Sequence, residues 1–433
     1  MFNANEFRFG PFLVDTRRQK IIRDGQPLRG WSRRRYALLK VLIEANGAPL
    51  TYDFLIETVW NQKDVTIHTV VKTVNDLKRN LGEHGACIHN LPGIGYYFQS
   101  PPHTSGVQTA DLDLDSLTRH ALAQEEFARR TRESLKVSLD NFRYVNGRYP
   151  GFVDAHLGRA ECLILLAHMG FQEFAPREVM PELRSAIQTS LDLAHDARTR
   201  AAAFAALAKY QLLFEWKFEE SEQNFQKALA LDSQSAAIYH GLAHVFLVKN
   251  RWDESDGAIT QARRMAPSSP MIHGTVGWLR FFMKRYAEAI EHCRQTTTLH
   301  PRFPAGYVML GVAYEAGGRF SEAKSAFESS YDLEPAPVPV ACLGHLYGHM
   351  GERAPAEECL LRLNEMKRNR FVSSYCYALI HTGLGEFEMA LESLREAVAE
   401  PCDWMIYLGL DPRWEPLRAF ADFSSLLSLV GVI

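Results

Sequence analysis

The 433-residue sequence predicts an α+β domain at its N-terminus, followed by an all-α array of paired helices. Two observations support this expectation. Short strand-like segments, three helix-like segments and a glycine-tipped hairpin follow one another within residues 1–99. Beyond them, aromatic and proline residues recur every 34 positions. We therefore expect an N-terminal domain over 1–99, a linker over 100–116 that is rich in Pro, Ser and Gly, and a repeat domain over 117–433.

The N-terminal domain is expected to open with four strands and one helix. Apolar and β-branched residues place the strands at 7–9, 12–15, 20–23 and 26–28, with Asp24-Gly25 as the last turn. Ser32 is the N-cap of a helix that runs to about Ala45 and ends at Asn46-Gly47. Its expected buried positions are Tyr36, Leu39, Val41 and Leu42.

The next segment is typical of a helix-turn-helix. Thr51 caps a helix that runs to Trp60, and a polar turn over 61–64 follows. The second helix, Val65 to Leu81, has apolar residues at spacings of four, three and four, which predicts one buried face: Val70, Val74, Leu77 and Leu81. Its opposite face is polar: His68, Lys72, Asn75, Asp76 and Arg79.

A hairpin with a glycine-rich tip, residues 88–98, completes a winged helix-turn-helix. A helix of this length fits the major groove of B-DNA, and a neighbouring hairpin can reach the flanking backbone or minor groove. Charge agrees with such a ligand. Residues 1–100 have 14 Lys and Arg against 9 Asp and Glu, whereas the whole chain has a net charge of −3. The pattern predicts a domain that binds DNA.

Cysteine usage and hydropathy point to the cytoplasm. The seven cysteines are scattered and form no C-x-x-C pair, which favours reduced thiols in an intracellular protein. The first residues have no basic segment before an apolar core, and no apolar stretch approaches the ~18–20 residues of a membrane helix. We expect a cytoplasmic protein without membrane partners.

The 34-residue period resembles the tetratricopeptide repeat. Trp252, Tyr286 and Phe320 each open a helix, and Phe218 lies 34 positions before the first of them. Small residues stand three positions after each aromatic residue: Ser221, Ser255, Ala289 and Ala323. Prolines stop the helices at the same period: Pro267, Pro301 and Pro335. A later copy spans Gly385 to Ala397.

The rest of the second domain shows helical spacing without the period. We expect degenerate repeats with helices at 118–145, 152–169 and 178–194, and a closing helix at 420–430 that covers the last repeat. Tyr239, His273 and Tyr307 occupy one repeat position on first helices, where they could line an effector site or belong to the core.

The order of strands, helices and wing resembles the OmpR/PhoB-type winged-helix domain over about residues 5–100. The resemblance is carried by Leu55, Val59-Trp60, Val70–Leu81 and Gly93-x-Gly95-Tyr96. With repeats behind this domain, the whole chain is similar to the invasion-gene transcriptional activators of enteric bacteria. The resemblance implies a third helix in the major groove, with eight candidates to face DNA: His68, Thr69, Lys72, Thr73, Asn75, Asp76, Lys78 and Arg79.

The resemblance also implies phosphate contacts outside that helix. These are backbone N–H groups at Thr51 and Tyr52, the indole of Trp60, and Tyr96 in the wing. The sequence departs from the family pattern at Asp76, Pro92 and Tyr97, where arginine is common. Such departures leave an alternative open, a protein-interaction adaptor whose winged helix no longer binds DNA.

No catalytic motif stands in the chain, so we expect neither an enzyme nor a cofactor. Cys342, His345 and His349 are zinc-ligand types at i, i+3 and i+7 of one helix, a weak metal candidate against ordinary repeat packing. The expected partner of the winged helix is double-stranded promoter DNA. The repeat domain could bind RNA polymerase, another protein, a small-molecule effector or a second copy of the chain.

Overall fold

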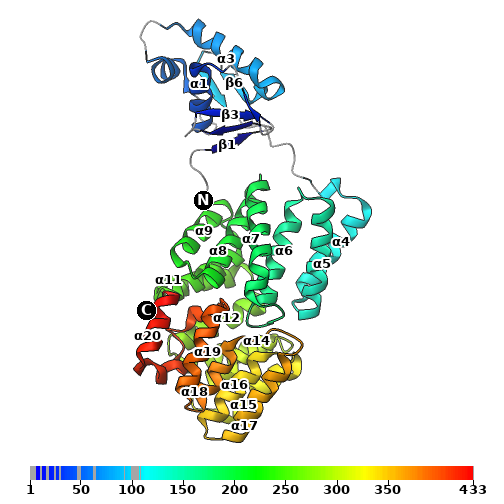
Figure 1. Ribbon diagram of the computed structural model, residues 1–433, viewed down its shortest axis with the longest axis vertical. Helices are drawn as coiled ribbons and strands as arrows, with labels where there is room; N and C mark the ends of the chain where they lie inside the picture. Colours follow the sequence, from blue (N-terminus) through cyan, green and yellow to red (C-terminus); the bar gives the residue numbers. More distant parts are fainter. Residues whose placement is uncertain are drawn as a thin grey trace. The chain divides into compact units, whose positions relative to one another are not determined.

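The computed structural model describes residues 6–9, 12–15, 19–23, 26–28, 31–45, 50–61, 65–91, 93–98, 107 and 109–432. The chain divides into two compact units, residues 1–106 and 107–433 (Figure 1). The second unit starts ahead of the expected position 117, because a short 3₁₀ turn, Thr109–Asp111, and the helix α4 from Leu114 already belong to it.

The first unit opens with a four-stranded antiparallel sheet of order β1-β2-β3-β4. Its strands lie where the sequence predicts them: Glu6–Phe9, Phe12–Asp15, Lys20–Arg23 and Gln26–Pro27. The helix α1, Arg33–Glu44, follows, and the side chain of Ser32 accepts a hydrogen bond from the Arg35 backbone N–H at 3.2 Å. The expected turns at Asp24-Gly25, at Asn46-Gly47 and over 62–64 lie outside the described residues.

The helix-turn-helix and wing also form as predicted, with one additional strand. The helix α2, Tyr52–Leu55, continues through a π-helical turn, Ile56–Trp60, and α3 spans Ile67–Leu81. A 3₁₀ turn, Gly82–Cys87, leads to β6, Ile88–Leu91, and β7, Gly95–Phe98. The additional strand is β5, Leu50–Thr51, which the sequence pattern did not reveal; it pairs with β7 and makes a three-stranded sheet of order β5-β7-β6.

Gly95 makes the close approach of β5 and β7 possible. A Cβ atom at this position would lie 1.9 Å from the carbonyl oxygen of Leu50, and the φ angle of Gly95 is +156°. Only glycine therefore fits where the wing pairs with the strand that leads into α2.

The core of the first unit lies beneath α3. The four predicted apolar residues of α3 are all buried: Val70, Val74, Leu77 and Leu81. They share one hydrophobic cluster with residues of α1. On α1 the predicted burial of Tyr36, Leu39 and Leu42 is confirmed, whereas Val41 is only half-buried. Leu38 and Ile43, which were not predicted, are buried as well. The helix packs against α3, the π-helical turn and β7, so its buried face is wider than a single stripe.

The second unit is a stack of antiparallel helix pairs (Figure 1). Its helices are α4 Leu114–Arg129, α5 Arg132–Arg148, α6 Val153–Ala167, α7 Pro176–Leu193, α8 Ala197–Tyr210, α9 Phe218–Leu231, α10 Ala236–Val248, α11 Trp252–Met265, α12 Pro270–Phe282, α13 Tyr286–Leu299, α14 Pro304–Ala316, α15 Phe320–Leu333, α16 Pro337–His349, α17 Arg353–Met366, α18 Ser374–Gly383, α19 Phe387–Ala399 and α20 Ala421–Val430.

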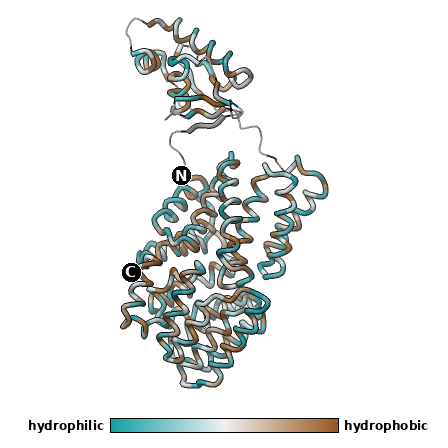
Figure 2. Tube along the Cα trace, viewed as in Figure 1, coloured by the Kyte–Doolittle hydropathy of each residue, from teal (hydrophilic) through white to brown (hydrophobic). Residues whose placement is uncertain are grey.

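The 34-residue period has a packing origin. Trp252, Tyr286 and Phe320 are the first residues of α11, α13 and α15, as predicted. The small residues three positions later are completely buried, so the two helices of each pair approach closely. Gly311 serves the same purpose in α14, because a Cβ atom there would lie 2.4 Å from the Phe327 ring. Hydrophobic and hydrophilic residues alternate along the helices of the array (Figure 2).

The expected single helix at 118–145 is wrong. Arg130 takes a left-handed conformation with φ of 55°, which ends α4. Thr131 then begins α5 with a capping box, in which its side chain accepts from the Ser134 N–H and Ser134 Oγ accepts from the Thr131 N–H. The helices expected at 152–169 and 178–194 correspond to α6 and α7.

The chain after α19 folds back over the first helices of the repeats. We call residues 402–417 the closing segment. It contains the 3₁₀ turn Asp403–Tyr407 and most of a second 3₁₀ turn, Pro412–Ala419. The Tyr407 ring stacks on Phe282 of α12 at 4.7 Å, and the Trp414 indole donates to the Tyr375 hydroxyl of α18 at 3.2 Å. The closing segment thus covers first helices of several repeats, and α20 packs behind it against α19.

Candidate nucleic-acid interface

The helix α3 presents a polar face to solvent because its apolar stripe is anchored in the core. His68, Lys72, Asn75 and Arg79 are exposed. The other candidates on this helix are half-buried: Thr69, Thr73, Asp76 and Lys78. All eight residues predicted to face DNA therefore have at least part of their side chain accessible, and they stand on a rigid helix of 15 residues.

Several of these side chains are held by neighbours on the same helix. Asp76 Oδ1 lies 2.5 Å from Arg79 Nη2, so the carboxylate offsets part of the arginine's charge. The Thr73 hydroxyl donates to the Thr69 carbonyl oxygen at 2.8 Å. Lys72 and Asn75 form no such pair among the described contacts, so a basic group and an amide remain to contact phosphate and a base edge.

The start of α2 offers less to a phosphate than the sequence predicts. The Tyr52 N–H donates to the Ile94 carbonyl oxygen in the wing at 3.0 Å, and the Phe54 N–H donates to Thr51 Oγ1 at 3.2 Å. The prediction of a free N–H at Tyr52 is therefore wrong, because the wing and the N-cap satisfy these donors internally. The Thr51 side chain itself is exposed.

Trp60 and Tyr96 belong to the core of the first unit. Their side chains are 5% and 4% exposed, so neither stands on an open DNA-facing surface. The Tyr96 ring meets Tyr52 edge to face at 5.8 Å, and burial raises the pKa of its hydroxyl. The packing gives both residues a structural role. Their roles as phosphate contacts, carried over from the family by position, stay predictions.

The wing and helix ends expose apolar residues that the sequence pattern did not single out. Ile67 at the start of α3 and Ile94 at the wing tip are each 51% exposed, and Phe54 on α2 is 45% exposed. Ile67 stands three residues before Val70 and continues the spacing of the buried stripe, so the sequence pattern gave no signal of its exposure. An apolar side chain at the start of a recognition helix suits the methyl group of thymine. Tyr97 is half-buried and stacks on His89 at 4.8 Å, and Pro92 lies outside the described residues.

The side chains of Cys342, His345 and His349 in α16, the weak metal candidate, do not come together around one point. Cys342 is fully buried and accepts from Arg413 Nη1 at 3.5 Å, whereas His345 Nδ1 lies 2.7 Å from Glu315 Oε1. His349 is exposed. Across the residues that the structure describes, no group of three or more His, Cys, Asp or Glu side chains is arranged to hold a metal ion.

The shared repeat position on first helices has a structural use. His273 Nε2 lies 2.5 Å from the Pro267 carbonyl oxygen, and the Tyr307 hydroxyl donates to the Pro301 carbonyl oxygen at 3.3 Å. Tyr239, which occupies the same position in α10, is half-buried against the core. His273 and Tyr307 therefore each connect a first helix to the preceding turn through a contact with a backbone carbonyl oxygen.

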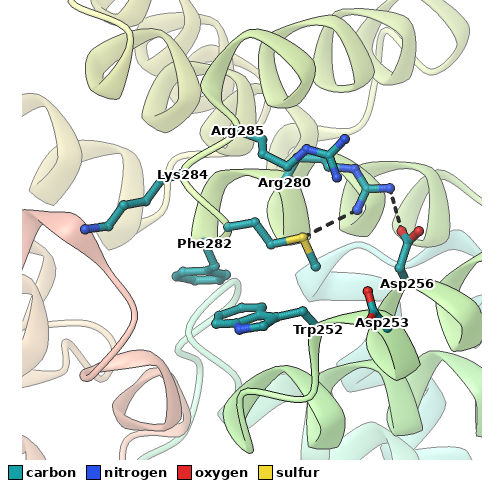
Figure 3. A pocket seen from close by; sticks show the side chains of 8 residues that line it. Trp252, Asp253, Asp256, Arg280, Phe282, Lys284 and Arg285 are labelled. Atoms are coloured by element: carbon teal, nitrogen blue, oxygen red, sulfur yellow. Dashed lines mark hydrogen bonds and ion pairs between the residues drawn. The ribbon is translucent and has the colours of Figure 1, made fainter.

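A polar pocket of about 460 Å³ lies between α11 and the turn from α12 to α13 (Figure 3). Arg280 Nη2 lies 2.5 Å from Asp256 Oδ1 within it. Its wall is completed by aromatic, apolar and charged side chains: Trp252, Asp253, Phe282, Met283, Lys284 and Arg285. Its mixed charges suit a small polar ligand, although Arg280 is already paired.

Family models match both parts of the chain. Residues 26–98 match the family described as "Transcriptional regulatory protein, C terminal", and residues 304–337 match "Tetratricopeptide repeat". The transcriptional regulatory protein CutR of Streptomyces coelicolor is 32% identical over 84 residues of this domain, which are 19% of this chain and 38% of CutR. The chain thus combines a domain of this regulatory type with tetratricopeptide repeats.

Other relatives are more distant. The anaphase-promoting complex subunit CDC16 of Saccharomyces cerevisiae is 23% identical over 206 residues, 46% of this chain and 24% of that relative. A solved structure titled "Crystal structure of APC/C hetero-tetramer Cut9-Hcn1" has a TM-score of 0.49 and 19% identity, and covers 76% of this chain and 57% of that one. Within the described ranges, no helix has both the length and the apolar character needed to cross a bilayer.

Proposed function

We propose that the protein is a cytoplasmic transcriptional regulator that binds promoter DNA through its first unit. The observation that carries this proposal is α3, whose apolar stripe is buried and whose exposed face bears Lys72, Asn75 and Arg79. The match of residues 26–98 to a transcriptional regulatory family supports it. The resemblance of the whole chain to invasion-gene activators stays a prediction within this proposal.

In this mode α3 lies in the major groove. Lys72, Lys78 and Arg79 neutralise phosphates, and the Asn75 amide contacts the edge of an adenine. Ile67 at the start of the helix contacts a thymine methyl group. The net charge along the face is modest, because Asp76 pairs with Arg79. Sequence-independent affinity is therefore expected to be low, and base contacts must supply much of the discrimination.

The second unit receives the regulatory input. The closing segment already covers first helices of the repeats, so a partner protein, RNA polymerase or an effector binds another surface or displaces that segment. The polar pocket beside Trp252 is the candidate position for a small effector, and the regulator has no catalytic role in this proposal.

A gel-shift assay with genomic promoter fragments tests the DNA-binding part. Combined replacement of Lys72, Asn75 and Arg79 by alanine is expected to abolish retention, while the far-ultraviolet circular dichroism of the full chain is unchanged. The matched control replaces the same three residue types at exposed positions in or beside α17: Lys367, Asn364 and Arg353. Unchanged retention by the α3 variant would contradict this use of the helix.

The adaptor alternative is favoured by one observation, the Asp76 carboxylate on the face that would meet phosphate. The salt dependence of binding separates the two functions. A DNA-binding protein loses affinity with a log–log slope of about −0.9 for each phosphate it neutralises. An adaptor gives no promoter retention even at low salt, and that result would favour it over the regulator.

A further inference from the structure

Four consecutive first helices of the second unit bring a group of polar side chains together. In this unit α4 contacts α6, α6 contacts α8, and α8 contacts α10. Burial is the main cause of the low pKa of His240, and the charges of Lys209 and Arg130 lower it further, so these groups lie near one another. We call the following residues the first-helix cluster: Arg130 at the C-terminal end of α4, Glu161 in α6, Lys209 in α8, and His240 and His244 in α10.

Arg130 brings a charge that no carboxylate of the chain pairs directly. The neighbouring Arg129 takes both nearby glutamates, with 2.7 Å to Glu125 Oε1 and 2.7 Å to Glu126 Oε1. Among the contacts of the described residues, Arg130 has no ion pair, and its guanidinium lies over the Phe127 ring at 4.3 Å. The side chain keeps contact with solvent, although desolvation by the surrounding protein lowers the pKa of its guanidinium. A bound anion would stabilise a cation in this setting.

Lys209 and Glu161 set the charge balance of the cluster. Lys209 Nζ lies 2.7 Å from Glu161 Oε1 and 2.9 Å from Glu161 Oε2, and the two side chains are 23% and 26% exposed. The charge of Glu161 also acts on Arg130. One carboxylate therefore serves two cations, which leaves an excess of one positive charge. This excess matches a ligand group with a single negative charge better than a phosphate dianion.

The histidines leave one ring nitrogen for a ligand. His240 Nε2 lies 2.9 Å from Thr275 Oγ1 and 3.3 Å from His244 Nε2. His244 Nδ1 lies 2.7 Å from the hydroxyl of Tyr407 in the closing segment. His240 Nδ1 has no partner among the described residues, and the side chain is half-buried rather than enclosed. A neutral imidazole carries its proton on either nitrogen, so the Nδ1–H form can donate to a carboxylate oxygen.

Other charged groups near the histidines do not oppose an anion. The charge of His168 acts on both His240 and His244, and His168 Nε2 lies 3.1 Å from Asp403 Oδ2. The Asp403 side chain is 2% exposed, and burial raises its pKa. Asp403 therefore presents no free carboxylate to a ligand.

We propose that Arg130, Lys209 and His240 bind the carboxylate group of a small organic acid. The Arg130 guanidinium takes both oxygens, Lys209 adds a second cation, and His240 Nδ1–H donates a hydrogen bond. The Phe127 ring gives the rest of the acid an apolar neighbour. These residues are distinct from those that line the pocket beside Trp252. The inference goes beyond the proposed function by giving the second unit a ligand class, and only its regulatory use rests on DNA binding.

Nuclear magnetic resonance of the full-length chain, labelled in its histidine rings, measures this binding directly. The His240→Gln variant identifies the His240 signal by its loss. Acetate, succinate and citrate are the probes, and each replaces chloride at constant ionic strength. At least one of them is expected to move the His240 signal saturably, whereas chloride alone is not.

Arg130→Gln is expected to raise the dissociation constant of that probe about tenfold or more, because it removes a charge-assisted bidentate contact. Arg129→Gln is the matched control, since this adjacent arginine is already paired with Glu125 and Glu126, and it should leave the constant unchanged. Circular dichroism checks that both variants keep their helices.

Three results would each overturn the proposal: no saturable shift with any carboxylate, an equal loss in Arg129→Gln, or tighter binding of inorganic phosphate than of every carboxylate. Promoter retention by Arg130→Gln, measured without a probe, is expected to equal that of the wild type. A failure of this site would therefore leave the DNA-binding function standing.

Discussion

Asp76 and Arg79 form an ion pair on the accessible face of α3, with 2.5 Å between Asp76 Oδ1 and Arg79 Nη2. The Arg79 side chain is 77% exposed, so the pair contributes little to the stability of the fold. Its importance lies in the electrostatic potential of the face. In the proposed DNA-bound state, the carboxylate repels phosphate and holds the guanidinium toward the helix, and both effects are expected to reduce affinity for DNA.

Replacing Asp76 by asparagine is therefore expected to strengthen DNA binding. We expect affinity for a random duplex to rise about three- to tenfold at low salt, with a log–log salt slope steeper by up to about 0.9. The melting temperature should change little, because exposed pairs contribute only about 0.2–1 kcal/mol. Fluorescence anisotropy at several salt concentrations measures both quantities. Glu57→Gln makes the same change of charge outside α3, and an equal gain there would contradict a specific role for Asp76.

Gly95→Ala is expected to disrupt the wing and the strand that leads into α2. The added methyl group would overlap the Leu50 carbonyl oxygen, so β5 and β7 must separate at a cost of about 2 kcal/mol or more. Gly93→Ala is the control, because its φ is +78° but no atom lies within 4 Å of the methyl group that it would add, which limits the cost to about 1–2 kcal/mol. Hydrogen exchange measured by mass spectrometry should accelerate in residues 88–98 and stay unchanged in α13 to α15.

Much of this architecture follows from spacing alone. Val70, Val74, Leu77 and Leu81 lie on one buried face because only a helix brings residues four, three and four apart into line. The 34-residue recurrence of Trp252, Tyr286 and Phe320 predicts the helix pairs for the same reason. Local geometry repeats wherever the local pattern repeats, so neither prediction needs knowledge of distant contacts.

Other features depend on contacts that no local pattern contains. Trp60 and Tyr96 are amphipathic, and only tertiary packing decides that their rings belong to the core. The closing segment meets partners far away in sequence, such as Met169, whose N–H donates to Asp403 at 3.0 Å. The break at Arg130 did have a local signal, since Thr131 and Ser134 form a capping box.

A half-buried histidine pair is expected to make the second unit sensitive to acid. His244 Nε2 lies 3.3 Å from His240 Nε2, and His244 Nδ1 lies 2.7 Å from the Tyr407 hydroxyl. Burial lowers the pKa of His244 to about 4, and burial together with the neighbouring His244 lowers the pKa of His240. Both side chains are therefore neutral in the fold and take up protons when the chain unfolds near pH 5.

Because the folded pKa values lie below the ordinary value of about 6.5, their contribution to stability is complete above that pH and is lost as the pH falls toward 4. We expect the melting temperature of the second unit to fall between pH 7 and pH 5. His244→Asn should flatten this dependence, whereas His349→Asn, at an exposed position of α16, should leave it unchanged. Differential scanning calorimetry at fixed ionic strength measures the slopes, and equal slopes for both variants would refute this assignment.

The closing segment is expected to be a main source of stability for the repeats. Trp414 is fully buried, its ring meets Tyr375 edge to face at 5.1 Å, and its indole donates to the Tyr375 hydroxyl. Trp414→Ala removes this packing and leaves a cavity, at an expected cost of about 3–5 kcal/mol in the free energy of unfolding. Urea denaturation followed by circular dichroism measures this loss.

Leu429→Ala is the matched control for this prediction, because it also shortens a C-terminal side chain but at a position that is 67% exposed. Its cost should stay within about 0.5 kcal/mol. Promoter retention by Trp414→Ala at low temperature, where the repeats stay folded, should equal that of the wild type, since α3 belongs to the other unit. A cost below about 1 kcal/mol, well under the usual range for a buried aromatic side chain, would mean that the repeats hold their arrangement without the segment. Their first helices would then be open to a partner.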